Sequence, residues 1–408
     1  MNRQMCADVV VTGIGVIGPG GGLGGGLGVA SPGNALASGP RRSVSDDVWL
    51  DVEAQLDPRG RKRPPPAAAY LLAATRCALA DAGDCLSMVD EDRRGFAVGT
   101  NSAVSGLART AIDGGAYDLS PARGSFSSVD MLAGWLPIPY APKGFNLMVT
   151  SPRVAGLEAV EIGSRAVALG RSSLLLAGAV EAPFPAHGRH ERGAGTAEAG
   201  AVALVVEPRE AALARGATVY GSCRVRTFFV PPRLLESREG RVRAGLAVQE
   251  TLSALRGASH EMPPVHTVLD DSAVSATVAA ALRGSSDGVI PHGSLDAPRR
   301  PGGEGCLEPM LHVARLLAQG DRDRIVVIAT AEGNGAFAQL SQHVPAGGPT
   351  DQPNRSQDTG AAGGLATARA ERSRRDACQF HSRAPGVSSR VRPTEWEEPR
   401  LRPGPGTG

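Results

Sequence analysis

Lysine is almost missing from this chain of 408 residues. Of its 43 basic residues, only Lys62 and Lys143 are lysines, and all the others are arginines. Arginine and lysine differ too much in chemistry for such a bias to serve one site, so we attribute it to a G+C-rich coding sequence. The 41 acidic residues bring the net charge to +2, which argues against a general nucleic-acid-binding surface.

Long apolar runs and paired cysteines are missing as well. No stretch of 18 apolar residues occurs, which predicts no transmembrane helix, and residues 1–8 are too short and polar for a signal peptide. We therefore expect a cytoplasmic protein. The cysteines form no C-x-x-C pair or His/Cys cluster, so the sequence predicts no disulfide framework, no zinc site and no cofactor. These cysteines are Cys6, Cys77, Cys85, Cys223, Cys306 and Cys378.

Short apolar runs alternate with helix-like segments up to residue 340, which predicts an α/β fold with a parallel or mixed sheet covered on both faces. The second half repeats this pattern more weakly. Strands are predicted at 9–13, 95–100, 145–149, 173–177, 201–206, 265–269, 325–329 and 336–340, and helices at 67–82, 156–169, 209–216, 275–282 and 307–317. Residues 346–408 hold too little apolar surface to offset the entropy of ordering, which predicts a disordered C-terminal tail.

One glycine motif suggests a nucleotide site. Gly13, Gly15 and Gly18 match the spacing G-x-G-x-x-G after a predicted strand. More glycines follow where a helix should begin, and residues 30–43 contain no Asp or Glu for a ribose hydroxyl. We therefore disfavour dinucleotide binding.

Six segments, in the correct order over residues 8–342, resemble β-ketoacyl synthases. They are the first strand and its turn at 9–19, the loop and helix end at 56–83, the strand at 95–100, Lys-Gly-Phe-Asn-Leu-Met-Val at 143–149, Ala-Gly-Ala-Val-Glu-Ala-Pro at 177–183, and Gly-Gly-Glu-Gly-Cys-Leu-Glu at 302–308. The segment at 177–183 has a form typical of the type II polyketide branch. In this family the glycines at 13–18 shape a loop and bind nothing.

The resemblance implies a thiolase-like, duplicated fold with α-β-α-β-α layers. It places an N-terminal ketosynthase-like half at 1–208 and a C-terminal half at 209–345, followed by the disordered tail at 346–408.

The nucleophile of this family is a cysteine on a turn between a strand and a long helix. Counted back from Gly-Leu-Glu-Ala-Val at 156–160, the cysteine position is Arg153. A guanidinium is not deprotonated in a protein and cannot attack a thioester. Ser151 is the alternative nucleophile, but the sequence identifies no general base for it. Pro152 fits poorly beside a nucleophile, because it lacks a backbone N–H for an oxyanion hole.

The other family positions have changed too. The two catalytic histidines map to Asp271 and Arg299, and the supporting lysine maps near Ser294. His266 and His292 lie nearby without the family's glycine-rich contexts, and we interpret them as core or solvated histidines. Arg153 and Asp271 occupy positions that approach each other in the family, so we expect either an ion pair between them or side chains directed to solvent.

By resemblance the chain is a degenerate ketosynthase, similar to the chain-length-factor subunits of type II polyketide synthases. Those factors lack the nucleophile and pair with an active ketosynthase. They usually carry glutamine at the cysteine position, from which Arg153 departs. The resemblance implies a ketosynthase subunit and an acyl carrier protein as partners, with no nucleic acid and no membrane. An acyltransferase that uses Ser151 and a decayed paralogue without function are the alternatives.

Overall fold

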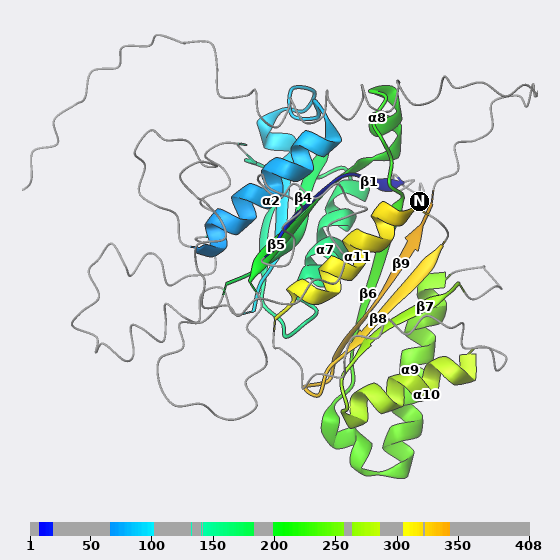
Figure 1. Ribbon diagram of the computed structural model, residues 1–408. Helices are drawn as coiled ribbons and strands as arrows, with labels where there is room; N and C mark the ends of the chain where they lie inside the picture. The colour runs from blue at the N-terminus through cyan, green and yellow to red at the C-terminus, as the bar shows by residue number, and fades with distance from the viewer. Residues whose placement is uncertain are drawn as a thin grey trace, which may run out of the picture. The chain divides into compact units, whose positions relative to one another are not determined.

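The computed structural model shows two β-sheets with helices on both faces of each (Figure 1). It describes residues 8–18, 66–101, 142–182, 199–256, 263–285, 305–320 and 323–342, together with Leu132 and Tyr140. Both sheets belong to one compact unit within Met1–Gln352. The tail predicted from residue 346 lies outside the described residues, so the predicted boundaries stay predictions.

The N-terminal sheet has the strand order β1-β5-β4-β2-β3. Its strands are β1 (Val9–Ile17), β2 (Arg94–Gly99), β3 (Asn146–Val149), β4 (Leu174–Glu181) and β5 (Gly200–Pro208). β1 and β4 both run antiparallel to β5, whereas β4 runs parallel to β2 and β2 parallel to β3. In the part of the chain that the structure describes, β3 therefore forms one edge of the sheet.

The C-terminal sheet repeats four strands of this pattern. Its order is β6-β9-β8-β7, with strands β6 (Ser222–Phe229), β7 (Val265–Leu269), β8 (Arg324–Ala329) and β9 (Asn334–Ser341). β6 and β8 both run antiparallel to β9, and β8 runs parallel to β7. The same sequence of pairings joins β1, β5, β4 and β2, so the duplication predicted from the sequence is present in the strand order.

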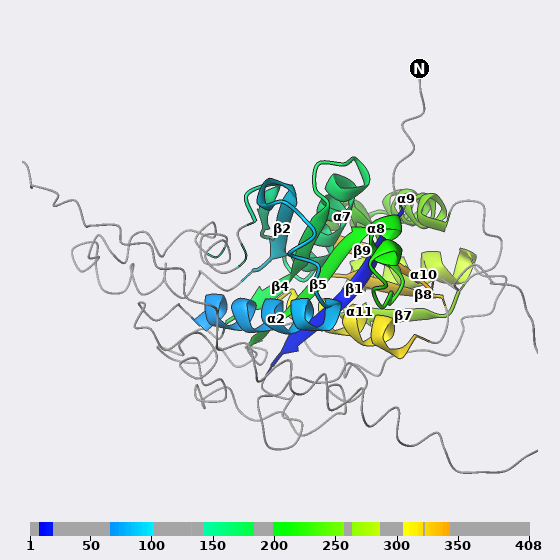
Figure 2. The same cartoon turned by 90° about the horizontal axis from the view of Figure 1, so that it is seen from above.

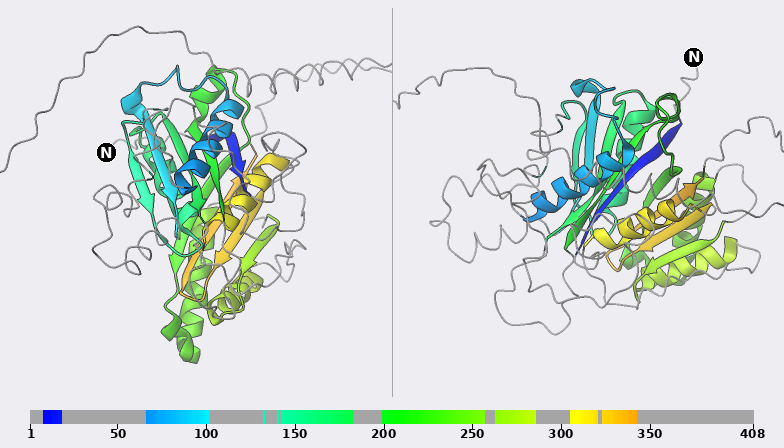
Figure 3. Two further views of the ribbon diagram at one scale, coloured as in Figure 1. Left: turned by 60° about the vertical axis from the view of Figure 1, so that its left-hand side comes forward. Right: turned by 45° about the horizontal axis from the view of Figure 1, so that its top comes forward.

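Among the described residues, five helices cover the two sheets in layers, and a short sixth, α8 (Arg209–Ala214), follows β5. α2 (Pro66–Ala82) lies on the outer face of the N-terminal sheet (Figure 2). α7 (Ala155–Ala168) and α11 (Leu307–Gln319) pack between the two sheets, and α9 (Arg238–Arg256) and α10 (Ala273–Ser285) cover the outer face of the C-terminal sheet (Figure 3). Two short 3-10 helices, Glu91–Arg93 and Pro232–Glu236, precede β2 and α9. The predicted α-β-α-β-α layering is confirmed.

Three apolar clusters fill the spaces between these layers. Side chains alternate along each strand, so each sheet offers one apolar face to the central helices and another to an outer helix. Leu175 and Val326 meet α7 and α11 from the two sheets, whereas Phe96 packs toward α2 and Phe337 toward α9 and α10. Both sheets are thus buried on both faces, as the apolar runs of their strands predict.

The glycine motif has a packing role. The expectation that these glycines shape a loop is wrong for Gly13 and Gly15, because β1 continues to Ile17. A Cβ on Gly13 would lie 2.1 Å from the Ala78 carbonyl oxygen, and one on Gly15 would lie 1.9 Å from that of Ala74. Both glycines therefore let α2 approach β1 more closely than any side chain would permit.

Candidate functional site

The candidate site lies where the first turns of α7 and α11 meet beyond the ends of β3 and β4. A Cβ on Gly156, in α7, would lie 2.5 Å from the Met310 side chain of α11 and 2.8 Å from Ala179 of β4. Glycine at this position allows the two central helices to come together. Residues from both halves of the chain thereby reach one place.

Arg153 occupies the turn between β3 and α7. Its φ is +59°, and it is the one non-glycine with positive φ among the described residues. The left-handed region costs a residue with a side chain on the order of 1 kcal/mol, and such conformations cluster at functional sites. The strand, turn and helix predicted around the nucleophile position are all present, and a guanidinium extends from the turn.

The Arg153 side chain forms an ion pair with the other half of the chain. Its Nη2 lies 3.0 Å from Oε2 of Glu308, in the first turn of α11, and the two side chains are only 12% and 25% exposed. A positive charge is unfavourable at a helix N-terminus, where the backbone N–H groups already carry partial positive charge. Glu308 supplies the negative charge that this position needs.

The expected pairing of Arg153 with Asp271 is not among the ion pairs of the described residues. Asp271 is exposed, and its neighbour Asp270 forms the polar network at the end of β7. The Asp270 carboxylate accepts hydrogen bonds from the hydroxyls of Ser272 and Ser275 and from the backbone N–H of Ala331. Burial raises the pKa of Asp270, but these hydrogen bonds outweigh it and leave the pKa below its usual value.

Ser151 has an acidic neighbour that the sequence analysis missed. Its hydroxyl donates a 2.6 Å hydrogen bond to Oε2 of Glu158, seven residues later on α7. A carboxylate in the first turn of a helix can reach a hydroxyl on the loop just before that helix. This spacing is the signal that could have identified Glu158. The pair gives Ser151 an acceptor for its proton.

Glu181 links three segments at the end of β4. Its buried carboxylate accepts hydrogen bonds from the backbone N–H groups of Asn101, at 2.8 Å, and Cys306, at 2.9 Å. The hydroxyl of Thr100 also donates to it, at 3.4 Å. Cys306 stands at the N-cap of α11, so Glu181 fixes the helix that carries Glu308.

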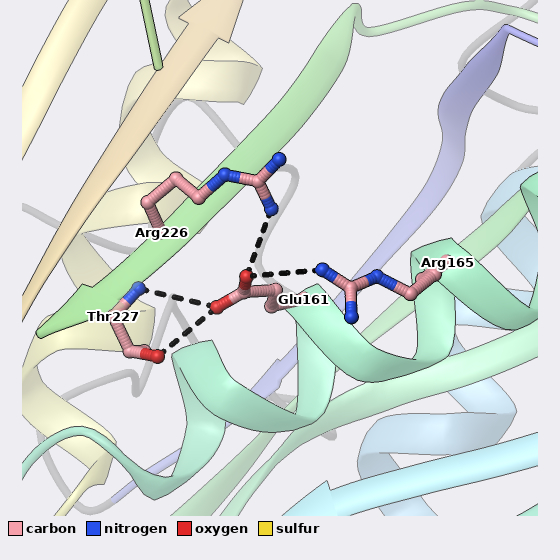
Figure 4. Close-up of polar contacts among 4 residues, drawn as sticks. All are labelled: Glu161, Arg165, Arg226 and Thr227. Atoms are coloured by element: carbon pink, nitrogen blue, oxygen red, sulfur yellow. Dashed lines mark hydrogen bonds and ion pairs between the residues drawn. The ribbon is translucent and has the colours of Figure 1, made fainter. Parts of the chain in front are cut away.

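A second polar junction joins the halves further along α7 (Figure 4). The Glu161 carboxylate lies 3.0 Å from the Arg226 guanidinium of β6 and 3.9 Å from that of Arg165. It also accepts hydrogen bonds from the backbone N–H and the hydroxyl of Thr227, both at 3.2 Å. This junction fixes the rotation of α7 against the C-terminal sheet and so helps to position Arg153.

Several predicted site residues lie outside the described part of the chain, namely Arg299, Ser294 and His292. His266, by contrast, is buried in β7, in line with its interpretation as a core histidine. Within the described ranges, no group of three or more His, Cys, Asp or Glu residues could hold a metal ion. No helix among them is long and apolar enough to cross a membrane.

Residues 45–216 match the sequence model of the "Beta-ketoacyl synthase, N-terminal domain". This part of the chain, which is less than half of its length, is similar to the β-ketoacyl synthase family. The match covers the turn between β3 and α7 and the four strands β2, β3, β4 and β5.

One curated relative is 3-oxoacyl-[acyl-carrier-protein] synthase 2 of Rhizobium meliloti (strain 1021), which is 28% identical over 144 residues. That alignment covers 34% of this chain and spans about a third of the relative's length, also 34%.

Solved structures of ketosynthases share the fold over most of the chain. The AntDE:AntF complex of a type II PKS acyl-carrier protein with its ketosynthase superposes with a TM-score of 0.62 at 19% identity, covering 83% of this chain and 99% of that one. The ishigamide ketosynthase/chain length factor gives 0.56 at 20% identity, with 82% and 99% covered. A β-ketoacyl synthase from Burkholderia phymatum STM815 gives 0.57 at 17% identity, with 83% and 100% covered. At these identities the similarity establishes the fold.

Proposed function

We propose that this chain is a non-catalytic ketosynthase-like subunit of the chain-length-factor type, acting in polyketide or fatty-acid biosynthesis in the cytoplasm. The observation that carries the proposal is Arg153 on the turn between β3 and α7, with its guanidinium held by Glu308. A cysteine on such a turn would gain nucleophilicity from the N-terminus of α7. Arg153 gives this position a permanent positive charge and no nucleophile.

The open edge of strand β3 supports the proposal that the chain pairs with a partner subunit. It pairs with β2 on one side, and its other side meets no strand among the described residues. Leu147 and Met148 of this strand are only partly buried against the core. An open apolar edge favours pairing with another chain. We propose an active ketosynthase as that chain, because two subunits without a nucleophile could not condense acyl groups, and an acyl carrier protein as the second partner.

Covalent labelling tests the absence of catalysis. The purified chain is incubated with acyl- and malonyl-loaded acyl carrier protein, and its intact mass is measured. We expect no gain in mass, since Arg153 cannot form a thioester. An active ketosynthase treated in parallel should gain the mass of the acyl group.

The hydrogen bond between Ser151 and Glu158 favours one second candidate, an acyltransferase. In that reaction the Ser151 oxygen would attack the thioester carbonyl while Glu158 takes the hydroxyl proton, and the carrier thiol would leave with a proton. A mass gain that disappears in Ser151→Ala would establish this candidate and overturn the non-catalytic proposal.

A further inference from the structure

Four basic side chains gather at the amino-terminal ends of β7 and β8, beneath the second half of α11. His266 is the second residue of β7, and Arg324 is the first residue of β8. Side chains two residues apart share a face of a strand, so His266 lies on the face of Val268 and Arg324 on that of Val326. Both valines belong to the apolar cluster that α11 covers. His266 and Arg324 therefore face α11.

α11 adds His312 and Arg315, which are both partly buried. Residues three apart on a helix are neighbours on its surface. The Arg324 Nη1 atom lies 3.3 Å from Nε2 of His266. Burial lowers the pKa of His266, and the positive charges of Arg324, His312 and Arg315 lower it further. The three other groups are thus close enough to His266 for their positive charges to act on its ring.

The cluster has too few acceptors. A guanidinium only donates hydrogen bonds, so Nε2 of His266 accepts from Arg324 and the ring proton sits on Nδ1. This Nδ1 is buried, in a residue only 7% exposed, and has no hydrogen-bond partner among the described residues. In the same part of the chain, no carboxylate forms an ion pair with Arg315 or Arg324. A buried donor without an acceptor, beside cations without counter-charges, is costly unless a bound anion accepts the hydrogen bond and balances the charge.

We propose that His266, Arg315 and Arg324 form a binding site for a phosphate-type oxyanion. Two guanidiniums match the oxygens of a phosphate group, and the Nδ1–H of His266 supplies a further donor. The double charge of phosphate offsets two cations, which a single carboxylate does not. Arg315 lies seven residues after Glu308, the partner of Arg153, on α11, or about 10 Å along the helix axis, so this site is separate from the one around Arg153. The proposal stands independently of the proposed function.

Thermal unfolding of the full chain in inorganic phosphate tests the site. Sodium chloride at matched ionic strength serves as the reference, since phosphate also stabilises proteins nonspecifically. We expect the Tm to rise with ln(1 + [phosphate]/Kd), by about 3 °C at a phosphate concentration ten times the Kd. Arg315→Gln and Arg324→Gln should each weaken phosphate binding at least tenfold, measured by isothermal titration calorimetry.

Arg243→Gln is the matched control, because it removes the same charge from an exposed pair with Glu239 on α9. It should keep the full response to phosphate. Circular dichroism checks that each variant is folded. If Arg324→Gln unfolds, Arg315→Gln on the helix surface gives the same comparison. A calorimetric titration without saturable binding, or a rise in Tm that is equal in the wild type and Arg315→Gln, overturns the proposal.

Discussion

At the scale of single residues, the central feature is the ion pair between Arg153 and Glu308. The resemblance identified Arg153, because the segment Gly-Leu-Glu-Ala-Val at 156–160 fixed the position of the turn. It did not identify Glu308, since nothing in a linear sequence tells which of many carboxylates a guanidinium will meet across 155 residues. The same holds for Glu158, whose hydrogen bond to Ser151 depends on how tightly the turn closes.

Removing the Glu308 charge should destabilise the chain. In Glu308→Gln the Arg153 guanidinium stays mostly buried at a helix N-terminus without its counter-charge, which should cost about 2 kcal/mol in the free energy of unfolding. Urea denaturation followed by circular dichroism measures the change.

Glu239→Gln is the control for this loss. It breaks a pair on α9 whose side chains are 68% and 82% exposed, and exposed pairs contribute about 0.5 kcal/mol or less. Equal losses of unfolding free energy in the two variants would show that the Arg153–Glu308 pair stabilises the chain no more than an exposed pair does.

At the scale of elements, the sequence predicted the strands and helices with strong apolar patterns and missed two others. β7 was predicted with its observed bounds, and α2 within one residue. β6 was missed because arginines interrupt its apolar positions, and α9 because it is rich in charged residues and contains two glycines. The buried residues Ala244, Val248 and Leu252 recur every four positions in α9, a helical signal that could have revealed it.

The contact between β1 and α2 gives a prediction at this scale. Gly15→Ala should cost about 3 kcal/mol in unfolding free energy, because its Cβ would meet the Ala74 carbonyl oxygen of the backbone at 1.9 Å. Gly245→Ala, in α9, is the control. Its Cβ meets nothing within 4 Å, so helix propensity should make it more stable by about 0.5–1 kcal/mol. Thermal and urea unfolding measure both variants, and a Gly15→Ala protein as stable as the wild type would contradict the packing argument.

At the scale of the whole molecule, the resemblance predicted the duplicated layers, and the strand orders of the two sheets bear them out. The sequence alone could not place the C-terminal site positions reliably. Arg299 and Ser294 depend on alignment through residues outside the described ranges, and the segment at 302–308 fixes only the start of α11.

Truncation after residue 345 tests the predicted tail. Residues 346–408 lack hydrophobic periodicity and are rich in Gly, Pro, Ser and Arg, so their removal should shift the Tm by no more than about 2 °C. Differential scanning calorimetry of the full and truncated chains gives the comparison. A larger drop would show that the tail packs against the folded part.

Co-expression with a ketosynthase that retains its cysteine, followed by size-exclusion chromatography with mass determination, tests the central claim most directly. The account predicts a 1:1 complex that Met148→Arg in β3 breaks, because a charge enters the open edge of the sheet. Met88→Arg, a control at a methionine that is 71% exposed, should leave the complex intact. A soluble, folded monomer of the wild-type chain at micromolar concentration, eluting apart from the ketosynthase, would contradict the claim and favour a decayed paralogue.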